Sequence, residues 1–134
     1  MLDTNILIRF FTGDPPDQAQ QTHSLIAAAD RGQITLILLP IIVAETVFTL
    51  QSYYKMNPKD IASRFVLLVQ SSGIQALEKD RILDAFQRYG DRKAGFVDAY
   101  ISAAAIEEDL PIASFDHDFD KFKGINRIEP TDRY

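Results

Sequence analysis

The chain has 134 residues, a net charge of −5 and no cysteine, and 46% of its residues are hydrophobic while 25% are charged. This length and composition indicate a single globular domain over residues 1–134, and they exclude a disulfide scaffold and a thiolate metal site. The acidic total argues against a protein that holds duplex DNA by charge alone, although bound cations can offset an acidic nuclease site locally.

The first half of the chain alternates strand-like and helical patterns. A break at Gly13 to Pro16 contains Asp14 as a candidate helix cap, followed by proline, which is typical of a helix start. The expected elements are a strand at 2–10, a helix at 16–30, a strand at 35–39 and a helix at 40–54.

The second half continues the alternation. Asn57 and Pro58 predict another capped helix start, and the residues around Gly73 predict its end. The expected elements are a helix at 57–70, a strand at 74–77, a helix at 79–89, a charged loop at 90–95, a helix at 96–109, a strand at 112–115 and a short strand at 126–129. This order is typical of an α/β fold with a parallel sheet and helices on its faces.

The sequence carries no signal for a membrane or for export. Asp3 and Arg9 interrupt the apolar residues at the N-terminus, so we expect no signal peptide. The longest apolar run, residues 34–44, is too short to span a bilayer. The lack of cysteine fits a reducing compartment, and we expect a cytoplasmic protein with no membrane association.

Four carboxylates fall where a parallel sheet would bring them together: Asp3, Glu45, Asp98 and Asp116. The first and last lie in or just after predicted strands, and the carboxyl ends of parallel strands form the binding crevice of such folds. Acids without histidine or cysteine are typical ligands of a hard divalent cation such as Mg²⁺ or Mn²⁺. Such an ion polarises phosphoryl oxygens and activates water, which favours phosphodiester hydrolysis.

Each acid also has a purely structural interpretation. Asp3, Thr4 and Asn5 could form only a turn, and Asp98 could be only a first-turn acid favoured by the helix dipole. Glu45 is harder to explain in this way, because it interrupts an apolar helix and an unpaired buried carboxylate is costly. Basic residues flank the later acids and could either contact phosphates or form a solvated surface: Arg88, Arg92, Lys93, Lys121, Lys123 and Arg127.

Four short motifs occur in a fixed order along nearly the whole chain. They are Asp3-Thr4-Asn5, then Glu45 with Thr46 and Phe48, then Asp98-Ala99, and finally Ser114 to Phe119. In size, order and spacing the chain resembles the PIN domain (PilT N-terminal domain) family, and within it the VapC-type toxin ribonucleases.

This resemblance implies a three-layer α/β/α fold with a central, mainly parallel sheet of four to five strands. It implies a Mg²⁺- or Mn²⁺-dependent endoribonuclease that acts on RNA, pairs with a small antitoxin protein and forms a homodimer. Carried over by position, Asp3, Glu45, Asp98 and Asp116 would be the catalytic metal ligands. The resemblance assigns supporting roles to Thr4, Asn5, Ser114 and Asp118.

Three alternatives stay open from the residues alone. A response-regulator receiver also has an acidic pocket, but it requires an acid near residues 75–77, where this chain has none. A DNA nuclease could use the same fold and the same acids. A non-catalytic RNA- or protein-binding domain could keep the fold without turnover.

Overall fold

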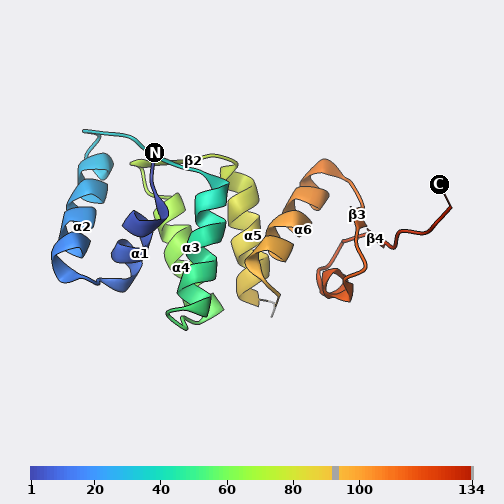
Figure 1. Ribbon diagram of the computed structural model, residues 1–134. Coiled ribbons are helices and arrows are strands. Elements are labelled where there is room, and N and C mark those ends of the chain that lie inside the picture. Colours follow the sequence, from blue (N-terminus) through green and yellow to red (C-terminus); the bar gives the residue numbers. More distant parts are fainter. Residues whose placement is uncertain (92–93, 134) are drawn as a thin grey trace.

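The computed structural model describes residues 1–91 and 94–133 (Figure 1). In this part of the chain the helices are α1 (Thr4–Thr12), α2 (Pro16–Asp30), α3 (Pro40–Ser52), α4 (Pro58–Val69), α5 (Lys79–Asp91), α6 (Phe96–Glu108) and the short 3₁₀ helix η1 (His117–Lys121). The strands are β1 (Leu36–Leu38), β2 (Ile74–Ala76), β3 (Ile112–Ala113) and β4 (Arg127–Ile128).

All four strands pair in parallel, as the alternating pattern predicts. β1 pairs with β2, and β3 pairs with β4, so the described residues contain two parallel pairs in place of one continuous sheet. The other edge of β1 is met by the extended residue Leu2, whose backbone N–H donates to the Ile37 carbonyl at 2.8 Å. The N-terminal residues therefore start at the edge of β1 before the chain turns into a helix.

The strand predicted at 2–10 is wrong, because most of that segment is α1. The Asp3 carboxylate accepts a hydrogen bond from the Thr4 N–H at 2.8 Å and caps the helix. Leu7 and Phe11 are buried at i and i+4, so the apolar run follows a helical period. Gly13 ends the helix with φ 73°, a conformation that favours glycine.

The other predicted helices are confirmed, with ends that differ by a few residues. α2, α3 and α4 each have proline at the start, and the Asn57 side chain accepts from the Lys59 N–H at 2.8 Å. α5 continues to Asp91, into the segment predicted as a loop, and residues 92–93 of that segment lie outside the described residues.

A line of aromatic rings forms the centre of the core. Phe65 lies 4.7 Å from Phe11 and 4.9 Å from Phe86, and Phe86 lies 4.7 Å from Phe96, measured between ring centroids. These rings belong to α1, α4, α5 and α6, so they tie together helices from both halves of the chain. No helix among residues 1–91 and 94–133 is long and apolar enough to cross a membrane.

The C-terminal segment lies against one helix. Figure 1 shows β3, η1 and β4 next to α6, on the side away from α5, and both β3 and η1 contact α6. This packing brings the loop after β3 to the same helix that carries Asp98.

Candidate metal centre

Three carboxylates meet beside α6. Asp98, Asp116 and Asp118 each offer an oxygen within 4.8 Å of the others. Asp98 is half-buried, whereas Asp116 and Asp118 are exposed. Residues that are 20 positions apart in the sequence thus form one acidic group that opens to solvent.

The start of α6 positions Asp98. Gly95 is the N-cap residue, and Asp98 lies in the first turn, where the helix dipole favours a negative charge. The Phe96 side chain, buried in the aromatic core, anchors this turn. Asp98 is therefore carried by the best-packed end of the helix.

The end of β3 positions the other two acids. The Ser114 N–H donates to the Ile128 carbonyl at 3.0 Å, which extends the pairing with β4. The Ser114 hydroxyl accepts from the Asp116 N–H at 2.9 Å, and the Asp116 carboxylate accepts from the Asp118 N–H at 2.8 Å and caps η1. These contacts fold the loop so that both carboxylates face the same region.

Arg127 on β4 holds this loop from behind. Its side chain is only 10% exposed, and its guanidinium donates to the Ser114 carbonyl at 3.0 Å, to Asp120 at 2.9 Å and to Glu129 at 2.9 Å. The sequence interpretation offered Arg127 as a possible phosphate contact, but in the structure its donors serve the fold. The signal that could have identified this role is its position in a strand beside an acidic loop.

Two other flanking basic residues are also paired. Lys121 lies 2.9 Å from Asp118, and Arg88 lies 3.1 Å from Asp84 on its own helix. Arg92 and Lys93, which belong to the same predicted cluster as Arg88, lie outside the described residues. Lys123 lines a small cavity with Arg88 and Asp91 on α5.

The surroundings of Asp98 shift the pKa of its carboxyl group. Burial is the main cause that raises the pKa of the Asp98 carboxyl above its ordinary value, and repulsion from Asp116 and Asp118 adds to it. Lys121 lies 2.9 Å from the carboxylate of Asp118, so a cation already contacts one of the three acids. A divalent cation among the three carboxylates would offset this repulsion and would favour the deprotonated form of Asp98.

Asp3, Thr4 and Asn5 lie at the start of α1. Asp3 and Asn5 are exposed, and Thr4 is half-buried. The Asn5 carbonyl accepts from Arg9 at 3.4 Å, one turn further along the helix. Asp3 does not belong to the group of three acids, so its predicted place beside Asp98 stays a prediction.

Glu45 lies on the solvent side of α3. The expectation that it is a buried carboxylate is wrong: Glu45 is exposed, while its neighbours Thr46 and Val47 are buried. Its carboxylate accepts a hydrogen bond from the Thr4 hydroxyl, which links α3 to α1. Glu45, like Asp3, lies outside the group formed by Asp98, Asp116 and Asp118.

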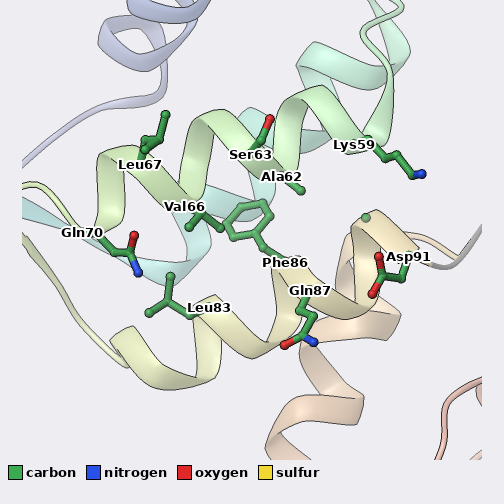
Figure 2. Close-up of a pocket in the computed structure, with 11 residues that line it drawn as sticks. Lys59, Ala62, Ser63, Val66, Leu67, Gln70, Leu83, Phe86, Gln87 and Asp91 are labelled. Carbon is green, nitrogen blue, oxygen red and sulfur yellow. The ribbon is translucent and has the colours of Figure 1, made fainter.

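A large cavity lies away from the acids. A cavity of about 740 Å³ lies between α4 and α5, with Lys59 and Asp91 at one end and Phe86 at its floor (Figure 2). None of the predicted site residues lines it. Because the three carboxylates that meet beside α6 lie elsewhere, the acidic group is the better candidate for metal-dependent chemistry.

The acidic group fits a hard dication. Mg²⁺ and Mn²⁺ bind oxygen ligands and keep several water molecules. The three carboxylates supply oxygen ligands, and because the group opens to solvent, water can occupy the other positions around the ion. Burial first, and then the neighbouring carboxylates, raise the pKa of Asp98, and a bound cation would favour its charged form. Phosphate oxygens of a substrate could fill the open positions around such an ion.

Parallel strands with covering helices, together with an acidic group after β3, define an α/β protein with a candidate site for a divalent cation. A family model described as PIN domain matches residues 1–125 of the chain. The chain belongs to the PIN domain family, whose fold is a three-layer α/β/α arrangement and whose members are generally nucleases that use divalent metals. No curated protein matched the chain.

Proposed function

We propose that the chain is a Mg²⁺- or Mn²⁺-dependent endoribonuclease that hydrolyses phosphodiester bonds in RNA. The observation that carries the proposal is the meeting of Asp98, Asp116 and Asp118 within 4.8 Å in a chain of the PIN domain family. The family supports a metal-dependent nuclease, and the choice of RNA rests on the resemblance of the motifs to the VapC-type ribonucleases.

The proposed ligands of the ion are Asp98 and Asp116, with Asp118 assisting. The bound ion would supply a polarised phosphoryl oxygen and a water of lowered pKa. Asp118 has the weaker claim because Lys121 already contacts its carboxylate. In this assignment Asp98 contributes its charge from the start of α6 and fixes where the scissile phosphate binds.

Asp3 and Glu45 are proposed to complete the site from the α1 side. Glu45 is exposed and accepts a hydrogen bond from Thr4, so the direction of its carboxylate is set. A carboxylate in this position can orient an attacking water and accept its proton. Asp3, next to Thr4, is the proposed additional metal ligand.

The cellular role is proposed from the same motifs. A toxin of a type II pair would bind a small antitoxin protein that blocks the acidic site, and it would act as a homodimer in the cytoplasm. The order of Asp3-Thr4-Asn5, Glu45, Asp98 and Asp116 supports this assignment.

The test is a cleavage assay on RNA and DNA oligonucleotides with Mg²⁺, Mn²⁺ or EDTA. We expect RNA cleavage that EDTA abolishes and that Asp98→Asn reduces by at least about 100-fold. Asp17→Asn is the matched control, because Asp17 is also a first-turn acid, on α2. Cleavage in EDTA would contradict the metal mechanism, cleavage of DNA alone would identify a DNA nuclease, and RNA binding without cleavage would identify a non-catalytic domain.

A further inference from the structure

A second cavity adjoins the acidic group. It has a volume of about 290 Å³ and lies between α3 and the start of α6. Four side chains in its lining matter for the argument: Phe48, Gln51, Val97 and Asp98. Because Asp98 lines this cavity and also belongs to the group of three acids, a molecule in the cavity would lie against one residue of the candidate metal centre.

Phe48 presents an aromatic ring to this cavity. The side chain is 70% exposed, although it belongs to α3, where Glu45 is the one charged residue. Phe48 follows Glu45 by three positions, so the two lie on the same face of the helix. The exposed ring thus shares a helix face with Glu45 and a cavity lining with Asp98. It offers a flat apolar surface that a heterocyclic base can cover.

Gln51 adds a directed polar group. The hydroxyl of the buried Tyr89 donates to the Gln51 side-chain oxygen at 2.5 Å. The Gln51 oxygen accepts this bond, and the same side-chain amide carries two N–H donors. A ring, an amide donor and the apolar wall formed by Val97 together match a nucleobase, which has a π-face and acceptor atoms on its edge.

We propose that this cavity is the subsite for one nucleobase of the RNA substrate, with the base stacked on Phe48 and its edge facing Gln51. The proposal rests on the proposed function, since it places the phosphate of that nucleotide beside Asp98. It makes Phe48 and Gln51 residues that bind and select substrate, not residues that perform the chemistry.

Steady-state cleavage of an oligoribonucleotide tests the stacking. Phe48→Ala should raise KM about tenfold and leave kcat nearly unchanged, because removing the ring removes the surface on which the base stacks. Tyr53→Ala is the matched control: Tyr53 is 76% exposed just after α3 and does not line the cavity. A KM for Phe48→Ala equal to that of Tyr53→Ala overturns the proposal.

Fluorescence tests the subsite without cleavage. The chain contains no tryptophan, so Phe48→Trp introduces a single reporter. With Ca²⁺ in place of Mg²⁺, an oligoribonucleotide should quench this tryptophan saturably, and the same backbone without bases should not. Equal quenching by both, or quenching by neither, contradicts base binding.

These measurements separate the subsite from the proposed nuclease. Base-dependent quenching without any cleavage by the wild type would keep the subsite and refute the nuclease. Cleavage with an unchanged KM in Phe48→Ala would keep the nuclease and refute the subsite. If Phe48→Ala instead lowers the molecular mass in solution and leaves KM unchanged, Phe48 contacts another protein chain and the proposal is wrong.

Discussion

The hydroxyl of Thr4 donates a hydrogen bond to the carboxylate of Glu45, and this contact joins the start of α1 to the middle of α3. Thr4 follows Asp3, the residue that caps α1, so the orientation of Glu45 depends on how that helix begins. The two acids outside the group of three are therefore coupled through one threonine.

Thr4→Val tests this coupling. Valine has nearly the same shape but cannot donate, so Glu45 should lose its fixed orientation and kcat for RNA cleavage should fall by roughly tenfold. The loss of one hydrogen bond should cost about 1 kcal/mol in the free energy of unfolding. Thr12→Val is the control, because the Thr12 hydroxyl donates only to the Ile8 carbonyl of its own helix at 2.7 Å. Wild-type kcat in Thr4→Val would show that the contact does not matter for catalysis.

Metal binding should stabilise the fold. An ion that binds only the folded chain raises the melting temperature by mass action, so millimolar Mn²⁺ should raise Tm and EDTA should reverse the change. Asp98→Asn should abolish the rise, whereas Asp17→Asn should keep it. Differential scanning calorimetry measures both effects, and an equal rise in Asp98→Asn would count against the assignment of Asp98.

The pH dependence of stability follows from the raised pKa of Asp98. In metal-free protein the folded state holds the Asp98 proton more tightly than the unfolded state does. The native state therefore binds more protons, and stability falls as the pH rises from the ordinary value of 3.8 through the raised pKa. Asp98→Asn lacks this penalty, so in EDTA its Tm should exceed that of the wild type at pH 7.

The Tm difference between wild type and Asp98→Asn should shrink as the pH is lowered below the ordinary value of 3.8, because Asp98 is then protonated in both the folded and the unfolded state. Thermal melts in EDTA across this range give the comparison directly. A wild type that is more stable than Asp98→Asn at pH 7 without metal would contradict a raised pKa of Asp98 in the free protein.

Arg127→Met should damage the site through the fold. The variant removes the donors to the Ser114 carbonyl, Asp120 and Glu129, and we expect a loss of about 1–2 kcal/mol in the free energy of unfolding. Mn²⁺ affinity should also fall, because the loop that carries Asp116 loses its anchor. Arg31→Met is the control, since Arg31 is exposed and makes a 3.4 Å bond to Gln33. Unfolding in urea measures the stability, and a titration of the folded protein measures the Mn²⁺ affinity. If Arg127→Met matches Arg31→Met in both, the anchoring role of Arg127 is wrong.

Local signals predicted most of the helices. Asn57 and Pro58 fix a helix start by capping and by the φ of proline, and these effects depend on neighbouring residues only. Leu36–Leu38 and Ile74–Ala76 are short apolar runs between turns, and their parallel pairing follows from the helices between them. Such features can be predicted because they do not require knowledge of distant contacts.

The start of the chain shows where local signals fail. The run from Ile6 to Phe11 is apolar enough for a buried strand or a buried helix, and periodicity over so few residues does not separate them. The Asp3 cap and the contact of Phe11 with Phe65 on α4 favour the helix. The second of these is a tertiary contact, which the sequence does not display.

The acidic group was predictable only in part. Asp98 and Asp116 were expected to approach each other, because a helix start and a strand end lie at the same edge of a parallel sheet. Asp118 joins them through its backbone bond to the Asp116 side chain, and Glu45 turns to solvent because Thr46 and Val47 fill the core side of α3. The first outcome depends on a local hydrogen bond and the second on how the side chains of α3 pack in the core.

Mn²⁺ binding measured by electron paramagnetic resonance tests most directly whether the three carboxylates hold a divalent ion. We predict saturable Mn²⁺ binding by the wild type and by Asp17→Asn, and a dissociation constant raised at least about tenfold in Asp98→Asn and in Asp116→Asn. Wild-type affinity in both site variants would contradict the assignment of Asp98, Asp116 and Asp118 as the metal centre.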